Sequence, residues 1–148
     1  PKKGCFGMND RKHVYAHSLP DFPKQKWETL DRHLSAVGEK AASFANVFSQ
    51  SFLAKIMGNL HDIGKCSNAF QSYIGTANLG SGQRGPDHST AGAVVALQLY
   101  GAGAAHFARL MAYGIAGHHA GLMDGVQLRE RERKKIEDYA GWQAHVRD

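Results

Sequence analysis

The chain has 148 residues, the length of one ordinary globular domain and enough to bury a hydrophobic core. Hydrophobic residues make up 43% and charged residues 21%, which excludes a collagen, a coiled-coil rod and a fully disordered chain. The formal net charge is +5, and most of the excess lies in a basic leader at about residues 1–24. This charge is compatible with a polyanionic partner but does not require one.

Helical patterns begin with apolar residues at steps of three and four from Trp27 to Phe48, which predict an amphipathic helix. A second helix is predicted at about residues 52–60, before a stop at Gly64. A short helix should include Phe70, Tyr73 and Ile74. A glycine-rich flexible loop follows at residues 75–87.

Two buried helices are predicted next, at about residues 88–100 and 104–116, with a break at the glycines of 101–103. This break and the polar residues nearby argue against a membrane span. A last helix is predicted at 126–140, and its charged run at 129–135 is most simply a solvated face. Because no segment alternates as a strand does, the predicted fold class is all-α.

Cysteine usage and the N-terminal segment indicate the compartment. The two cysteines, Cys5 and Cys66, have no Cys-x-x-Cys spacing and are too few for a disulfide scaffold. No apolar run of a signal peptide follows the N-terminus. We therefore expect free thiols in a reducing cytoplasm.

Nine residues are histidine, the commonest metal ligand, and several of them stand in suggestive places. His33 lies on the apolar face of the first helix, where a hydrogen-bonded core histidine is the usual alternative. His61 and Asp62 are adjacent at a helix end, so their side chains diverge by about 100°. Such a pair can offer an imidazole to one ion and a carboxylate that bridges two.

Two further motifs begin and end the buried helices. His88 stands between Asp87 and Ser89, where N-capping by either neighbour is the alternative interpretation. His118 and His119 are flanked by small residues, which lets both imidazoles lie close to an ion.

Taken together, these motifs supply five imidazoles and one carboxylate. A nitrogen-rich set suits Mn, Fe, Co, Ni or Zn rather than Mg²⁺ or Ca²⁺, which prefer oxygen ligands. Six ligands exceed the needs of one open catalytic ion. They would serve two ions that share Asp62, about 3.5–4 Å apart.

The ordered set of motifs resembles the HD domains of metal-dependent phosphohydrolases. More narrowly, it resembles the HD nuclease domain of the CRISPR-associated helicase-nuclease of type I systems. The resemblance covers about residues 15–125. It rests on Ala16-His17-Ser18, Trp27…Leu30…His33-Leu34, His61-Asp62-Ile63-Gly64-Lys65, Phe70-Gln71, Asp87-His88-Ser89-Thr90-Ala91-Gly92 and Gly117-His118-His119-Ala120-Gly121-Leu122.

This resemblance implies a single HD nuclease domain over residues 1–148, an all-α HD-domain helical bundle with a dinuclear metal site at its centre. It assigns His33, His61 and Asp62 to one ion. It assigns Asp62, His88, His118 and His119 to the other. Asp62, His61 and Lys65 are the expected catalytic residues, with Lys65 and Ser89 near the substrate phosphate. His17 is left open between a contact at the site and a structural hydrogen bond.

The implied activity is cleavage of single-stranded DNA, endonucleolytic or exonucleolytic, with a divalent transition metal and without use of ATP by this domain. The implied target is the displaced strand of the R-loop opened by a guide-RNA surveillance complex in the prokaryotic cytoplasm. A helicase module, fused or separate, is the other implied partner.

One departure from the family opens two alternatives. The family has a further Asp ligand well downstream of the double histidine, whereas this chain ends 29 residues after His119 without a matching motif. The C-terminal part is therefore expected to be truncated, with the first ion weakly held or absent. The alternatives are an inactive metal-binding fragment and a nucleotide phosphohydrolase of the wider HD superfamily.

Overall fold

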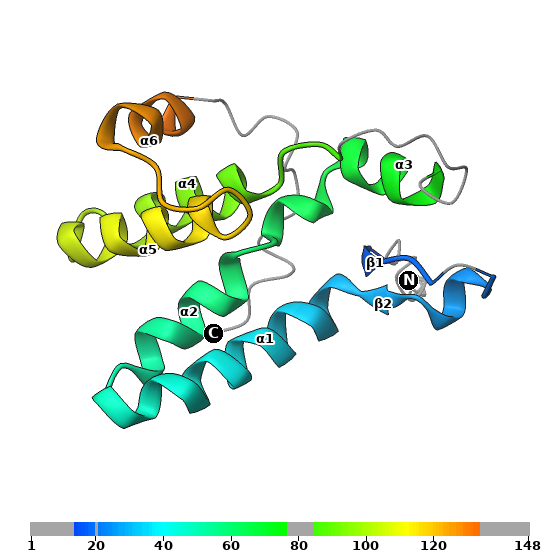
Figure 1. Cartoon of the computed structure of the whole chain (residues 1–148), viewed down its shortest axis with the longest axis horizontal. Helices are drawn as coiled ribbons and strands as arrows, with labels where there is room; N and C mark the ends of the chain where they lie inside the picture. Colours follow the sequence, from blue (N-terminus) through cyan, green and yellow to red (C-terminus); the bar gives the residue numbers. More distant parts are fainter. Residues whose placement is uncertain (1–13, 20, 77–84, 134–148) are drawn as a thin grey trace, which may run out of the picture.

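The structure is a computed structural model that describes residues 14–19, 21–76 and 85–133. The predicted leader, loop and last helix lie partly outside these ranges. The prediction of an all-α fold is confirmed (Figure 1). The α-helices are α1 Leu30–Ala45, α2 Ser51–Leu60, α3 Asn68–Thr76, α4 Ser89–Tyr100, α5 Ala105–Gly117 and α6 Gly125–Glu132. Short 3-10 turns are η1 Lys24–Lys26, η2 Asn46–Phe48 and η3 Ile63–Cys66.

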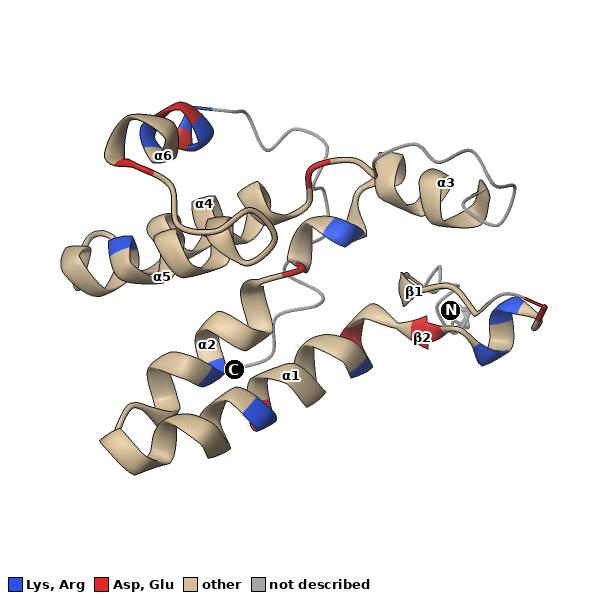
Figure 2. Cartoon of the chain, in the orientation of Figure 1, with Lys and Arg blue, Asp and Glu red and all other residues tan. Residues whose placement is uncertain are grey.

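The helices are arranged as two pairs that meet at one end. In Figure 1, α1 and α2 form one pair and α4 and α5 form the other, with α6 covering the second pair. The largest hydrophobic cluster lies between α2, α4, α5 and α6, and the first eight residues of α4 are all buried. Figure 2 shows no charged residue on α4, which explains how other helices can cover it on several sides.

A smaller hydrophobic cluster joins the two pairs beside Asp62. It consists of Ala16, Leu30, Leu34, Ile63 and Ala91. These residues come from the N-terminal strand, α1, η3 and α4. Burial of this cluster therefore holds four separate segments of the chain around the end of α2.

Two short strands were not predicted from the sequence. β1 (Tyr15–His17) pairs antiparallel with β2 (Glu28–Thr29), with an irregular register between Tyr15 and His17. The Gln71 amide fixes β1 to α3, because its Nε2 donates to Tyr15 O at 2.8 Å and its Oε1 accepts from Tyr15 N at 3.1 Å. The same Nε2 donates to Lys65 O at 2.7 Å. One partly buried amide thus ties β1 to the segment that follows Asp62.

Several predicted helix boundaries change in the structure. The first helix begins at Leu30, because Trp27 precedes β2 and packs with Phe70 and Ile74 in a separate cluster. Phe44 and Phe48, which continue the apolar pattern, are exposed. The last predicted helix is observed as α6, and its range from residue 134 onward is outside the described residues.

The apolar stretch 91–117 forms α4 and α5 with a turn at Gly101–Gly103, as predicted. No helix in the described ranges is both long and apolar enough to cross a membrane.

Cys66 carries a free thiol, as predicted, whereas Cys5 lies outside the described residues. Burial raises the pKa of the Cys66 thiol to about 11, so the thiol is protonated at neutral pH. It packs against the small cluster beside Asp62 as an apolar group.

Gly92 marks the closest approach between α4 and the end of α2. A Cβ at this position would collide with the backbone carbonyl of Leu60 and lie 2.9 Å from Ile115 Cγ2. We expect Gly92→Ala to lower the free energy of unfolding by about 1–3 kcal/mol, because a backbone carbonyl cannot move aside easily. Urea unfolding followed by circular dichroism measures this loss.

The matched control is Gly75→Ala in the exposed last turn of α3, where nothing lies within 4 Å of the added Cβ. This substitution should leave stability unchanged or raise it by up to about 1 kcal/mol, because alanine is the better helix former. Equal effects of the two substitutions would contradict the proposed close contact.

Candidate metal centre

A single buried carboxylate lies at the meeting point of the two helix pairs. Asp62 follows the end of α2 directly and is 3% exposed. Five imidazoles surround it, and all five belong to the residues predicted from the sequence. They are His33 on α1, His61 at the end of α2, His88 before α4, and His118 and His119 after α5.

The two oxygens of Asp62 face different imidazoles. Oδ2 lies 3.1 Å from His33 Nε2 and 3.2 Å from His61 Nε2. Oδ1 lies 3.3 Å from His118 Nε2 and 3.4 Å from His88 Nε2. This division matches the two ligand groups that the family resemblance implies.

Backbone carbonyls orient three of the histidines in the same way. The Nδ1 atoms of His61, His88 and His118 lie 2.7, 3.0 and 2.7 Å from the carbonyl oxygens of Gly58, Pro86 and Ile115. A carbonyl oxygen can only accept, so each Nδ1 carries a proton and the Nε2 of each ring faces the centre. Such outer contacts are typical of histidines that bind metals.

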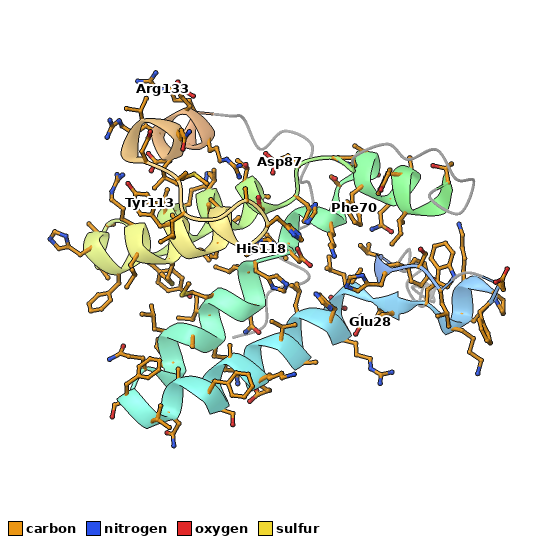
Figure 3. The ribbon with its side chains drawn as sticks, in the orientation of Figure 1. Glu28, Phe70, Asp87, Tyr113, His118 and Arg133 are labelled. Atoms are coloured by element: carbon orange, nitrogen blue, oxygen red, sulfur yellow. The ribbon has the colours of Figure 1, made fainter. Side chains whose placement is uncertain are left out.

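Glu28 takes the place of a backbone carbonyl for His33. Its Oε2 lies 3.3 Å from His33 Nδ1, so the Nε2 of this ring also faces Asp62. In Figure 3, Glu28 lies below His118 in the view. Sequence reasoning missed Glu28, because its place becomes evident only when β2 is seen beside the start of α1.

Gly64 allows the chain before α4 to approach Asp62. A Cβ on Gly64 would lie 2.8 Å from His88 Cα and would also collide with the His88 carbonyl oxygen. The glycine in this motif was predicted as a helix stop. The structure adds that it leaves room for the backbone of a candidate ligand from another segment.

The charge state of the carboxylate is set by competing effects. Burial disfavours the anion, but its close contacts with the imidazoles of His118, His33 and His61 outweigh burial and hold the pKa of Asp62 well below its usual range. Burial lowers the pKa of His88 and of the more exposed His119, which favours their neutral forms. Burial opposes the charged form of His118 as well, but its contact with Asp62 outweighs burial and raises the pKa of this histidine. Asp62 is therefore an anion at neutral pH.

Lys65 is a buried cation behind Asp62. It is 5% exposed, and its Nζ lies 2.8 Å from Asp62 Oδ2 and donates to Ala16 O at 3.3 Å. The ring of Phe70 lies 5.4 Å from the same atom. A direct contact between Lys65 and a substrate phosphate would require the ammonium group to leave these partners.

Ser89 is also largely buried, at 6% exposure, within a polar network. Its hydroxyl donates to Asp87 and accepts from Arg131 Nη1 at 3.1 Å. Asp87 accepts from Thr90 N at 3.1 Å, so the capping interpretation of this motif describes a real contact. The serine hydroxyl that was expected near a phosphate is therefore engaged within the protein.

Arg131 is an exception to the predicted solvated face of the last helix. It is partly buried, and its Nη1 also donates to Ala116 O at 3.2 Å, which joins α6 to the end of α5. Alternating charges along a helix carry no signal that separates this arginine from its neighbours. Asp124, by contrast, caps α6 through Val126 N and Gln127 N.

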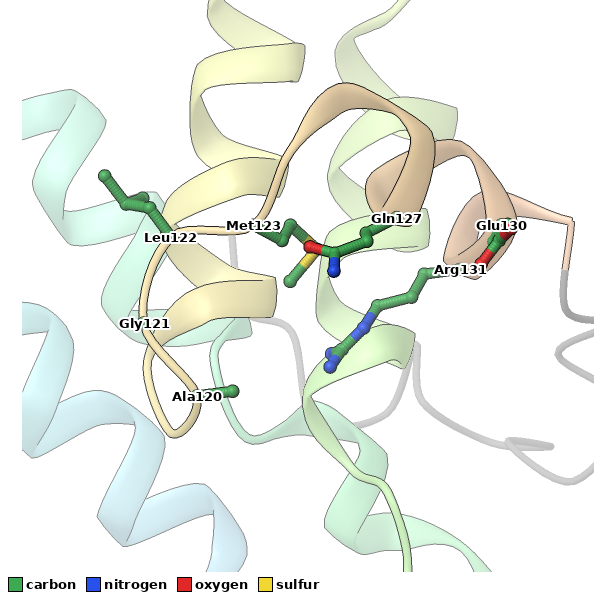
Figure 4. A pocket seen from close by; sticks show the side chains of 7 residues that line it. All are labelled: Ala120, Gly121, Leu122, Met123, Gln127, Glu130 and Arg131. Carbon is green, nitrogen blue, oxygen red and sulfur yellow. The ribbon is translucent and has the colours of Figure 1, made fainter.

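A pocket of about 380 Å³ lies beside the turn that follows His119, and Arg131 extends into it (Figure 4). Its lining consists of Ala120, Gly121, Leu122, Met123, Gln127, Glu130 and Arg131. Within the described part of the chain, Arg131 has no carboxylate partner. The pocket therefore contains one guanidinium group beside the turn that follows His119, with Glu130 also in its lining.

The donor set fits a transition-metal ion. Asp62, His88, His118 and His119 each offer a ligand atom, and these atoms lie within 4.8 Å of one another. Asp62 Oδ1 is buried without a hydrogen-bond partner, and the Nε2 atoms of His88 and His119 face each other at 2.9 Å. A cation between these atoms would satisfy the orphaned oxygen and the nitrogen lone pairs together.

Four histidines of the sequence are not among the five imidazoles around Asp62. His17, whose role was left open, lies at the end of β1 beside His33. His106 is exposed on α5. His13 and His145 lie outside the described residues.

Comparison with known proteins supplies the family. The family described as "Cas3, HD domain" matches residues 8–148. The chain belongs to the Cas3 HD domain family. This membership makes it a Cas3-type HD nuclease, that is, a metal-dependent hydrolase associated with CRISPR interference. No curated protein matches the chain.

Bound metal should stabilise the folded chain, because the ligands come from segments that are far apart in sequence. Mn²⁺ or Ni²⁺ at about 100 times its dissociation constant should add about 2.7 kcal/mol, and so raise the melting temperature of the wild-type chain by several degrees. Differential scanning calorimetry with and without metal measures this shift.

His119→Ala, which removes an exposed member of the centre, should reduce the metal-dependent shift. His106→Ala removes another exposed imidazole and should leave the shift unchanged. A shift of the same size in both variants would show that metal binds elsewhere.

Proposed function

We propose that the chain is a metal-dependent nuclease that hydrolyses phosphodiester bonds of single-stranded DNA in type I CRISPR interference. Its target would be the displaced strand of an R-loop. The observation that carries this proposal is the position of Asp62 between two groups of imidazoles. A carboxylate that bridges two ions is the central element of two-metal hydrolysis.

In this proposal, the Oδ2 side of Asp62 binds one ion with His33 and His61. The Oδ1 side binds the second ion with His88, His118 and His119. When bound, the ions supply a water molecule that loses its proton readily and positive charge that stabilises the phosphoryl oxygens. Nitrogen donors favour Mn, Fe, Co or Ni over Mg²⁺ in these places.

The residues around the ions would act by fixing geometry. The carbonyl contacts of His61, His88 and His118 hold each ring in one orientation, so little reorganisation is needed when a substrate binds. Lys65 offsets the charge of Asp62 and fixes Oδ2 from behind. We therefore infer that Lys65 positions the Asp62 carboxylate. This role replaces the contact with the substrate phosphate that the family resemblance implies.

The substrate would approach from the side of His119. This residue and the turn at 118–121 are exposed, whereas Asp62 and Lys65 are buried. The pocket that holds Arg131 lies next to this turn and would receive a phosphate or base beside the scissile bond. A flexible single strand can follow such a path more easily than a duplex.

The wider setting of the activity belongs to the same proposal. A helicase module, fused or separate, and a guide-RNA surveillance complex would deliver the strand in the prokaryotic cytoplasm. The domain itself would need no ATP, because hydrolysis of a phosphodiester requires only water and the metal centre.

Substitution of the bridging carboxylate tests the reaction. Asp62→Ala and Asp62→Asn should abolish Mn²⁺- or Ni²⁺-dependent cleavage of single-stranded DNA, because both ions lose their shared ligand. Each leaves Lys65 buried without its partner, so unfolding must be monitored by circular dichroism at the assay temperature. His119→Ala provides a variant with an intact buried pair and should lower cleavage at least tenfold.

The same assay should include a panel of deoxynucleoside triphosphates and cyclic nucleotides. Hydrolysis of nucleotides but not of DNA would favour the nucleotide phosphohydrolase. Metal binding without any turnover would favour the inactive fragment. Either result would overturn the proposed nuclease.

Arg131 gives a separate test of the strand path. Arg131→Gln should weaken binding of a short single-stranded DNA about fivefold or more, because a charged contact worth about 1 kcal/mol or more is lost. The slope of log affinity against log salt should fall by about 0.7, as expected for one phosphate contact to a single strand. Fluorescence anisotropy without added metal measures both effects.

Arg129→Gln is the matched control, because Arg129 is exposed on the same helix and does not line the pocket. Its effect should be less than about twofold. Since Arg131 also joins α6 to α4 and α5, the melting temperature of each variant must be recorded alongside. Equal losses in affinity would place the strand elsewhere.

A further inference from the structure

We propose that His17 is a metal ligand on the Oδ2 side of Asp62, together with His33 and His61. This inference rests on the proposed function, because it assigns a further ligand to one of its two ions.

His17 lies within reach of an ion at this side of the centre. One ligand atom each from His17, His33 and Asp62 can be chosen so that all three lie within 4.8 Å of one another. The ring of His17 meets the ring of His33 edge-on, with centroids 4.8 Å apart. His61 Nε2 is 3.2 Å from the same carboxylate oxygen, so three imidazoles and one oxygen gather there.

The backbone of His17 is fixed to the centre by several contacts. Ala16 O accepts a hydrogen bond from Lys65 Nζ, and Lys65 is the partner of Asp62. Tyr15 is bonded to Gln71 through both its backbone groups. β1 is therefore attached to Lys65 and Gln71 in the segment that follows the carboxylate, which limits how far His17 can move.

The side chain of His17, by contrast, is available for a ligand. It is 53% exposed, and within the described residues it makes no hydrogen bond. Its nearest ionic group is Glu28, whose Oε2 lies 3.9 Å from His17 Nε2 and 3.3 Å from His33 Nδ1. No described residue lies within hydrogen-bond distance of the His17 ring nitrogens, so the ring can turn toward an ion without breaking a contact within the described part of the chain.

The arrangement gives the two sides of Asp62 the same composition. His88, His118 and His119 accompany Oδ1, and His17, His33 and His61 would accompany Oδ2. Three imidazoles and a carboxylate oxygen satisfy four positions of a transition metal, and a six-coordinate ion would retain two positions for water and substrate. The first ion would then need no ligand from beyond the described residues.

Isothermal titration with Mn²⁺ tests the assignment in the full 148-residue chain. The wild-type chain should bind two ions. His17→Ala and His17→Gln should weaken one of the two binding steps at least tenfold and leave the other unchanged. His17→Asp, which supplies a carboxylate oxygen in place of the imidazole nitrogen, should lose less affinity than His17→Ala. His106→Ala should match the wild type.

Anomalous diffraction from crystals soaked in Mn²⁺ provides the second measurement. The wild type should show two peaks, one of them within about 2.3 Å of a His17 ring nitrogen, and His17→Ala should lose that peak or show it weakened. Two unchanged binding steps in His17→Ala, or a peak distant from His17, would overturn the inference and leave the proposed function intact. Absence of any metal binding in the wild type would instead overturn both.

Discussion

The structure depends on keeping one negative charge buried. A carboxylate at 3% exposure would be costly in an apolar interior, and here Lys65 and five imidazoles surround it. These partners come from α1, from the segment 61–65 that follows α2, and from the segments before α4 and after α5. Stabilising Asp62 therefore requires that the end of α2, the start of α1 and the segments around α4 and α5 all meet at one point.

Lys65 contacts both the Asp62 carboxylate and the segments that pack around it. A buried ion pair alone is weak evidence for stability, because desolvation of both charges opposes their attraction. In this chain the ammonium group also binds Ala16 O and lies over Phe70, so it connects β1 and α3 to the carboxylate. Its burial suggests that the positive charge serves to position Asp62.

The sequence predicted the helices well, and it picked out imidazoles that the structure brings together around Asp62, because both signals are local patterns. Apolar periodicity indicated α2, α4 and α5 to within a residue or so, and each candidate ligand stands in a short motif with glycine or aspartate beside it. The strands escaped prediction because β1 has only three residues and β2 only two, too few to show an alternating pattern.

Residues that act through tertiary contacts could not be predicted in this way. Glu28 and Arg131 stand in unremarkable polar surroundings in the sequence, and only the pairing of β2 with β1 and the packing of α6 on α4 give them partners. The burial of Lys65 and Ser89 could not be predicted from the sequence for the same reason. A sequence motif indicates which residues belong to the same site. How deeply each side chain is buried, and which way it points, depends on the tertiary contacts of the elements packed around it.

The two glycines at the joint of the helix pairs have a consequence for how the centre responds to metal. Gly64 brings the backbone of His88 against the segment that carries Asp62, and Gly92 brings α4 against the Leu60 carbonyl. At both points backbone atoms of two segments are in close contact. The spacing between the segments that carry the donor atoms is therefore fixed before a metal ion binds. Binding then costs little conformational entropy, and the interatomic distances discriminate between ions by radius. The centre resembles a rigid macrocyclic chelator more than a flexible peptide that folds around its metal.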